Sequence, residues 1–157
     1  MESRYRYRFY PTNQQKLLLA KLYGCARWVW NEALAYCQEV GKYIGYNALT
    51  KRLTVPKKQV EWLTEVSSVA LQQALRNLDR ACSNFFKGKG APQFKKKSNR
   101  QSVTLTKSSF SLQGKKVYLA KIGEMSPIWI KELPSQPIVV EVPRVVVSAK
   151  FPSIGID

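Results

Sequence analysis

The alternation of apolar and polar residues separates the chain into a short strand-like start, a helical part and a second strand-like part. Residues 4–9 alternate strictly between arginine and an aromatic residue, and this period of two is typical of a β-strand with one cationic and one aromatic face. Pro11 ends the strand. Thr12, followed three residues later by Gln15, predicts a capping box at the start of a helix.

Apolar residues then recur at steps of three and four, which predicts a long helix that ends near Val40. The apolar stripe expected on this helix is Leu18, Leu22, Ala26, Val29, Ala33 and Cys37. A short helix over YNALTKRLT is expected to finish before Pro56, because proline disfavours the helical conformation of the residue that precedes it. The next segment, VPKKQVEWLTEV, reads as a loop with one helical turn.

A second long helix is expected after Ser67 or Ser68, either of which can act as its N-cap. Its expected buried stripe is Leu71, Leu75, Leu78, Cys82 and Phe85. Glycine and proline in KGKGAPQF end this helix, and the basic segment FKKKSNRQS links it to the rest of the chain. The helical part therefore covers residues 12–99.

After residue 100 the period changes to two, which predicts short strands over SVTLTK, FSLQ, KVYLAK, IWIKEL, IVVEV and RVVVSAKF, with a hairpin turn at QGKK. The first strand, within residues 1–11, needs partners, and the other predicted strands lie within residues 100–150. The helical part is therefore expected to be inserted into an all-β domain, most simply a small barrel, in an α+β fold.

Charge is the strongest compositional signal. The 157 residues contain 26 Lys and Arg against 10 Asp and Glu, a formal net charge of +16, which points to a phosphate polymer as partner. No run approaches the roughly 18 apolar residues of a membrane span, and the N-terminus has no apolar signal segment, so a cytoplasmic location is expected. The predicted phosphate-binding residues are Arg4, Arg6, Arg8, Lys95, Lys96 and Lys97.

The chain contains no histidine, which excludes histidine general bases, Cys-His nucleophiles and histidine-ligated zinc. Cys25, Cys37 and Cys82 are widely spaced on helical patterns. They fit neither a disulfide framework nor a zinc knuckle, so we expect them to be buried thiols.

Three segments taken in order resemble one known family. RFYPTNQQKLLLAKLYGCARWVWNEAL, then LTEVSSVALQQALRNLDRACSNFFKGKGAPQFKKK, then SVTLTKSSFSLQGKKVYLAKIG are similar to successive blocks of the TnpB-type (OrfB-like) proteins of bacterial insertion sequences. The match extends over residues 4–123. The resemblance implies the N-terminal part of a transposon-encoded, RNA-guided DNA nuclease related to type V CRISPR effectors, with guide RNA and double-stranded DNA as partners.

The resemblance also implies an oligonucleotide-binding-like (wedge) β-barrel with an inserted helical recognition bundle, a region that older usage calls a helix-turn-helix. In the family a RuvC-like nuclease domain follows, in which Asp, Glu and Asp hold divalent metal. GID at residues 155–157 is similar to the motif that carries the first of these carboxylates, so residues 151–157 read as a stub of that domain and Asp157 as an isolated catalytic residue.

No counterpart of the other two carboxylates follows Asp157, and one carboxylate cannot fix two metal ions. We therefore expect the chain to be a truncated, internally deleted or deliberately shortened member that is inactive alone, with no cofactor of its own. Mg²⁺ is expected only in a complete member, and a separate nuclease half is a further possible partner.

The resemblance also supplies candidate residues for reading a DNA motif. The positions that match are Tyr46, Thr50, Ser68, Val69, Gln72, Thr106 and Lys107. Tyr46 and Gln72 fit the family pattern, whereas Ser68 and Val69 replace a Lys-Phe pair found in some members. Glutamine can form two hydrogen bonds with adenine, and an aromatic ring can stack on a base, so both residue types suit this role.

Two alternatives stay open on the sequence. The first is a stand-alone DNA-binding regulator that uses a helix-turn-helix, although about 25 residues separate the two long helices and such a motif needs a turn of about 3–4. The second is a structural RNA-binding protein, which only the charge and the expected barrel support.

Overall fold

The computed structural model describes residues 3–8, 10–99, 102–106, 108–113, 116–125, 139–143 and 146–151. Strands β1, β6 and β7 are described by their backbone alone. The chain divides into two compact units. The β unit contains residues 1–20 and 100–157, and the helical unit contains residues 21–99.

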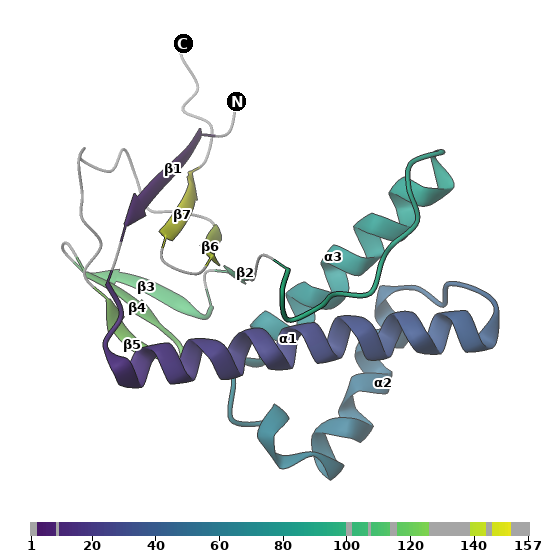
Figure 1. Ribbon diagram of the computed structural model, residues 1–157, viewed down its shortest axis with the longest axis horizontal. Coiled ribbons are helices and arrows are strands. Elements are labelled where there is room, and N and C mark those ends of the chain that lie inside the picture. Colours follow the sequence, from purple (N-terminus) through teal and green to yellow (C-terminus); the bar gives the residue numbers. More distant parts are fainter. Residues whose placement is uncertain are drawn as a thin grey trace. The chain divides into compact units, whose positions relative to one another are not determined.

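The described strands of the β unit form two antiparallel sheets. Strand order in the four-stranded sheet is β1 (Ser3–Arg8), β7 (Val146–Phe151), β6 (Val139–Pro143) and β2 (Ser102–Thr106) (Figure 1). The three-stranded sheet consists of β3 (Phe110–Gln113), β4 (Lys116–Leu119) and β5 (Gly123–Met125). The described part of the chain adds three α-helices to these strands, so the fold class is α+β, as the sequence pattern predicts.

Strand β1 pairs antiparallel with β7, so that Arg4 lies opposite Lys150 and Arg8 opposite Val146. The prediction that the first strand finds its partners beyond residue 100 is therefore confirmed. Period-two burial is visible in β2 and β4, where Val103 and Leu105, and then Val117 and Leu119, are buried between more exposed neighbours.

The strand predictions differ in detail from the structure. Gln113 pairs with Lys116, as a hairpin at QGKK requires, although residues 114–115 lie outside the described part. Strand β5 was not predicted, because GEM is too short to show alternation. The predicted strand IWIKEL, residues 128–133, lies outside the described residues.

Helix α1 (Asn13–Val40) begins with the predicted capping box. The N–H of Gln15 donates to Thr12 Oγ1 at 3.2 Å, and the N–H of Thr12 donates to Gln15 Oε1 at 3.0 Å. The predicted stripe is buried from Leu22 to Cys37. Leu19, Cys25 and Trp30, which were not part of the predicted stripe, are buried as well. At the other end, the N–H groups of Gly41 and Lys42 both bond to the carbonyl of Cys37, and Gly41 has φ +83°.

Helix α2 (Tyr46–Gln59) does not stop before Pro56, so that prediction is wrong. Proline removes one helical hydrogen bond, to the carbonyl of Arg52, but Thr54 and Val55 are exposed and water can reach this turn. The helix is held by its buried side chains Leu49 and Leu53. The predicted single turn follows as the 3₁₀ helix η1 (Glu61–Leu63).

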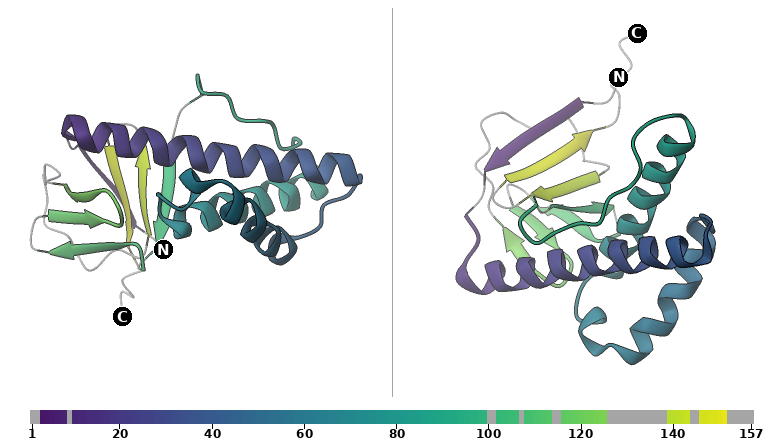
Figure 2. Two further views of the ribbon diagram at one scale, coloured as in Figure 1. Left: turned by 90° about the horizontal axis from the view of Figure 1, so that it is seen from below. Right: turned by 45° about the vertical axis from the view of Figure 1, so that its right-hand side comes forward.

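Helix α3 (Ser68–Phe86) has Ser67 as its N-cap, although the side chain makes no capping hydrogen bond. Leu71, Leu75, Leu78 and Cys82 are buried as predicted. Phe85 is 47% exposed, which contradicts its predicted place in the core. Phe85 belongs to the last turn of α3, which stands away from α1 and α2 in the helical unit (Figure 2). The apolar residues of the sequence therefore keep their helical spacing beyond the point where other helices cover them.

The three cysteines are free and buried, as expected. Burial raises the pKa of Cys25 and of Cys82 above the ordinary thiol value, which keeps both thiols neutral. Among the described helices, none combines the length and the apolar character that crossing a membrane requires.

Candidate nucleic-acid interface

The outer face of α3 carries several of the predicted DNA-reading residues. Ser68, Gln72 and Arg76 follow at steps of four, and Val69 precedes Gln72 by three, so these four side chains share one face of the helix. The buried stripe of α3 lies on the opposite side. Ser68 is exposed and Gln72 is half-buried, so Gln72 is a surface residue and lies outside the core.

Tyr46 is brought beside this outer face by Arg76. The guanidinium of Arg76 lies 4.3 Å from the centroid of the Tyr46 ring, within cation-π distance. Tyr43 O–H donates to Asp79 Oδ1 at 2.5 Å. Asp79 follows Arg76 by three residues on α3, so this bond attaches the connection between α1 and α2 to α3. Burial, and then this hydrogen bond, raise the pKa of Tyr43 well above its ordinary value.

The other predicted DNA-reading residues are distributed over both units. Thr50 O–H donates to the carbonyl of Tyr46 at 2.9 Å, within α2. Thr106 ends β2 in the β unit, where its hydroxyl is 3.4 Å from that of Ser108. Lys107 lies outside the described residues. The structure therefore groups Tyr46 with the outer face of α3, and the grouping of Thr106 and Lys107 with them stays a prediction.

Residues 93–97, here called the lysine strap, are bound to the side of α1. The indole N–H of Trp30 donates to the carbonyl of Gln93 at 2.9 Å. Asn31 binds the backbone of Lys95 twice, because its Nδ2 donates to the carbonyl at 2.9 Å and its Oδ1 accepts from the N–H at 2.8 Å. An asparagine amide thus substitutes for a neighbouring strand and holds an irregular segment in one conformation.

Lys95 is exposed as a residue, yet its Nζ lies 4.1 Å from the centroid of the Trp30 ring. Partial burial of the ammonium group lowers the pKa of Lys95. Lys96 and Lys97 follow in the exposed part of the strap, with no acidic residue between Arg80 and Asn99. The strap therefore displays positive charge along a fixed backbone.

The remaining predicted site residues are only partly placed. Arg4, Arg6 and Arg8 alternate along β1, which puts them on one face of that strand, while their side chains lie outside the description. Asp157 lies outside the described residues. Within the described part of the chain, no cluster of three Asp, Glu, His or Cys side chains could hold a metal ion, so no metal chemistry is assigned to these residues.

Sequence reasoning missed Arg76, Trp30 and Asn31 as parts of this interface. Arg76 lies off the predicted apolar stripe of its helix, and a charged residue at such a position is usually only solvated. Trp30 and Asn31 bind a segment 63 and 64 residues further along the chain, and no periodicity reports such a contact. The one available signal was an asparagine within a helix pattern, where its intrinsic helix propensity is low.

Comparison with known proteins adds the following similarities. A profile of the helix-turn-helix domain of the IS605 OrfB type matches residues 1–42, a range that contains β1 and α1 and ends before α2. A protein of Streptomyces pristinaespiralis named "Putative RNA-guided DNA endonuclease" is 40% identical over 152 residues, which cover 89% of this chain and 38% of that protein.

InsQ of Escherichia coli (strain K12), named in the same way, is 31% identical over 129 residues, 77% of this chain and 32% of InsQ. The virulence protein VsdF of Salmonella dublin is 33% identical over 107 residues, which cover 58% of this chain and 90% of VsdF. The chain thus spans roughly a third of the length of the two proteins named as endonucleases, and nearly the whole of VsdF.

Proposed function

Because the chain belongs to the TnpB-type (OrfB-like) family of insertion-sequence proteins, we propose that it is a nucleic-acid-binding N-terminal portion of an RNA-guided DNA endonuclease. The names of the two longer relatives support guide RNA and double-stranded DNA as its partners, and a cytoplasmic location belongs to the same proposal. The net charge of +16 supplies the attraction for both polymers.

The proposed architecture is a wedge-type barrel in the β unit with the helical unit inserted between its first two strands. Support comes from the pairing of β1 with β7, which joins the first strand to the last one described. It also comes from the grouping of residues 1–20 with residues 100–157. In this architecture the helical unit is the recognition module.

The observation that carries the proposal is the outer face of α3, where Gln72 lies one turn from an arginine that covers the Tyr46 ring. A half-buried glutamine next to a fixed cation and an aromatic ring can bond a base edge while the cation contacts a phosphate. We assign motif reading to Gln72 and Tyr46. Phosphate contact is assigned to the lysine strap and to the arginines of β1.

Two neighbouring glutamines make a matched test of this assignment. Gln72→Ala and Gln73→Ala remove the same side chain at adjacent, half-buried positions of α3, and only Gln72 is a predicted DNA-reading residue. Binding to a randomised duplex pool, followed by sequencing of the bound fraction, measures the motif preference of each variant. Gln72→Ala should relax the preference at one base position, by about 5- to 150-fold if Gln72 bonds that base through both of its amide atoms.

Equal preferences in the two variants would contradict the assignment of Gln72. Salt dependence tests the phosphate contacts separately. Lys96→Gln combined with Lys97→Gln should reduce the slope of log affinity against log salt by roughly 0.9 for each duplex phosphate that is no longer neutralised, without changing motif preference. A flat salt response of the unmodified chain would refute binding through phosphate contacts.

A further inference from the structure

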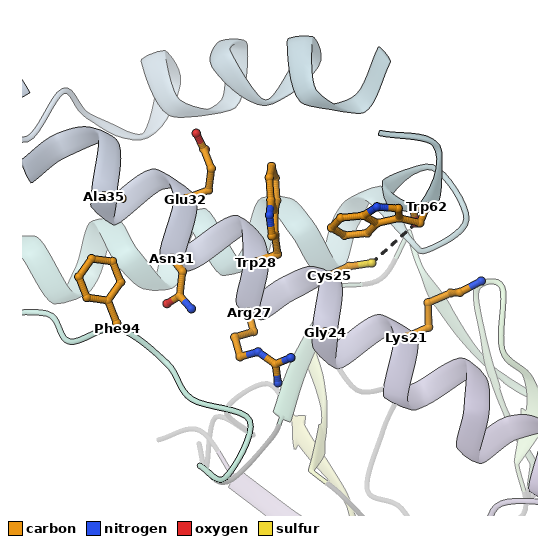
Figure 3. A pocket seen from close by; sticks show the side chains of 10 residues that line it. All are labelled: Lys21, Gly24, Cys25, Arg27, Trp28, Asn31, Glu32, Ala35, Trp62 and Phe94. Atoms are coloured by element: carbon orange, nitrogen blue, oxygen red, sulfur yellow. Dashed lines mark hydrogen bonds between the residues drawn. The ribbon is translucent and has the colours of Figure 1, made fainter. Parts of the chain in front are cut away.

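A groove in the helical unit, separate from the outer face of α3, runs along the exposed side of α1. Its volume is about 820 Å³, and α1, the η1 segment and the lysine strap supply its lining (Figure 3). Clefts of roughly 300–1,000 Å³ hold drug-sized ligands, so the groove has room for one or two nucleobases. Its lining is mainly apolar and includes Gly24, Trp28 and Ala35 of α1.

Three aromatic rings from three different segments meet this groove. Trp28 and Trp62 are perpendicular, with ring centroids 5.6 Å apart, and Phe94 lies on the strap side (Figure 3). Trp62 is 40% exposed and Phe94 is 45% exposed. Among the described residues, no acceptor is paired with the indole N–H of Trp28 or of Trp62. The groove thus combines open ring surface with two indole N–H groups for which the described residues supply no acceptor.

The charges around the groove favour an anionic chain. Its one acidic lining residue, Glu32, is paired with Arg52 at 2.5 Å, and Lys21 is paired with Glu65 at the other end. Three lysines follow Phe94 directly in the strap. A polyanion could therefore run along the strap while its bases enter the groove, because Glu32 and Glu65 are each paired with a cation.

We propose that this groove binds unpaired bases of the guide RNA, stacked on Trp62 and Phe94, with the adjoining phosphates held by the lysine strap. The proposal rests on the proposed function and adds to it a site for single-stranded RNA. Aromatic rings beside a cationic track are the arrangement by which proteins hold single strands, since every base has a π-face and every nucleotide a phosphate. An apolar peptide would use the rings but would gain nothing from the lysines.

The test uses the full chain and two fluorescent probes of equal length, an oligouridine and an abasic ribose-phosphate oligomer. Fluorescence anisotropy at one salt concentration gives the affinity for each. The unmodified chain should bind oligouridine about 5- to 150-fold more tightly for each base that stacks. Trp62→Ala and Phe94→Ala should each weaken the affinity for oligouridine by about the factor that one stacked base contributes. The affinity for the abasic oligomer and the salt slope should stay unchanged.

Phe86→Ala is the matched control, because Phe86 is a 70% exposed aromatic residue of the same unit that does not line the groove. Its affinity for both probes should stay within twofold of the unmodified chain. The probe comparison on the unmodified chain needs no substitution, and Phe94 is exposed enough to replace without unfolding. The probe comparison on the unmodified chain and the affinity of Phe94→Ala therefore test base stacking in the groove even when the Trp62 variant misfolds.

Equal binding of oligouridine and the abasic oligomer by the unmodified chain would overturn the inference. Equal effects of Phe94→Ala and Phe86→Ala on oligouridine would overturn it as well, and would leave the groove to an apolar polypeptide segment. Both results are compatible with phosphate binding and leave the proposed function standing. Failure of the unmodified chain to bind either probe, or duplex DNA, would refute the two together.

Discussion

Replacing Asn31 by alanine should release the middle of the lysine strap without unfolding the protein. The Asn31 amide makes both of the hydrogen bonds that hold the backbone of Lys95, at 2.9 and 2.8 Å. Alanine preserves the helix and removes both bonds. Trp30 keeps its own bond to the carbonyl of Gln93, so the strap remains attached at one end.

The magnitude follows from the two hydrogen bonds that alanine cannot make. A typical intramolecular hydrogen bond contributes about 0.5–1.5 kcal/mol net, and these two are exposed, so water replaces part of each. We therefore expect Asn31→Ala to lower the free energy of opening the strap by about 1–2 kcal/mol. That change raises the population of the open strap roughly 5- to 30-fold. Global stability should change less, because opening a surface segment does not require unfolding.

Trypsin reports this opening directly, because it cleaves after Lys95, Lys96 and Lys97. When the strap recloses faster than the protease cuts, the cleavage rate follows the open population. Mass spectrometry of the fragments should show cleavage at these three sites accelerating by the same 5- to 30-fold in Asn31→Ala. Cleavage after Lys58, on α2, should stay unchanged and provides an internal reference.

Gln38→Ala is the matched control, since Gln38 is an exposed amide on the same helix whose side chain makes no hydrogen bond to the strap. It should leave cleavage of the strap at the unmodified rate. The reasoning is refuted if Asn31→Ala and Gln38→Ala are cleaved equally fast at Lys95–Lys97. It is also refuted if the faster cleavage is accompanied by an equal loss of global stability, because the strap would then be part of the core.

Two further predictions concern stability. Tyr43→Phe should lower the free energy of unfolding by about 1–2 kcal/mol at neutral pH, because it loses the hydrogen bond to Asp79. The folded-state pKa of Tyr43 is raised, so this contribution is fully present below the unfolded-state pKa of about 10 and is lost as the pH rises further. Urea titrations from pH 7 to 11 should therefore show the unfolding free energies of the two proteins converging. A difference in unfolding free energy that stays constant over this range would contradict the prediction. Leu78→Ala, at a fully buried position, should cost about 2–5 kcal/mol in the same assay, whereas Leu17→Ala, at a 73% exposed position, should change stability by less than about 0.5 kcal/mol.

The reach of sequence reasoning differs between elements for identifiable reasons. The capping box at Thr12 and Gln15 is correct because both partners lie within one turn and their chemistry is local. The end placed before Pro56 is wrong because a local rule was applied where buried leucines hold the helix together. The core assignment of Phe85 is wrong because a helical period can continue beyond the neighbours that cover it.

In the candidate interface, too, some residues are predicted from the sequence and others are identified only by the structure. Gln72 and Tyr46 are predicted from a family resemblance, and the structure adds Arg76, which covers the Tyr46 ring. The groove beside α1 was not predicted at all. Its three aromatic residues come from α1, η1 and the strap, and each of them alone looks like an ordinary apolar position in the sequence.

The sequence by itself predicted most of the elements, and its charge indicates a polyanionic partner. Periods of two and 3.6 record which face of each strand or helix is buried, and a net charge of +16 is a sum that needs no coordinates. Tertiary structure alone decided that β1 pairs with β7 and that Asn31 holds Lys95. These contacts join residues far apart in the chain, and such pairs form because folding brings complementary hydrogen-bonding groups together, which leaves no periodic mark in either segment.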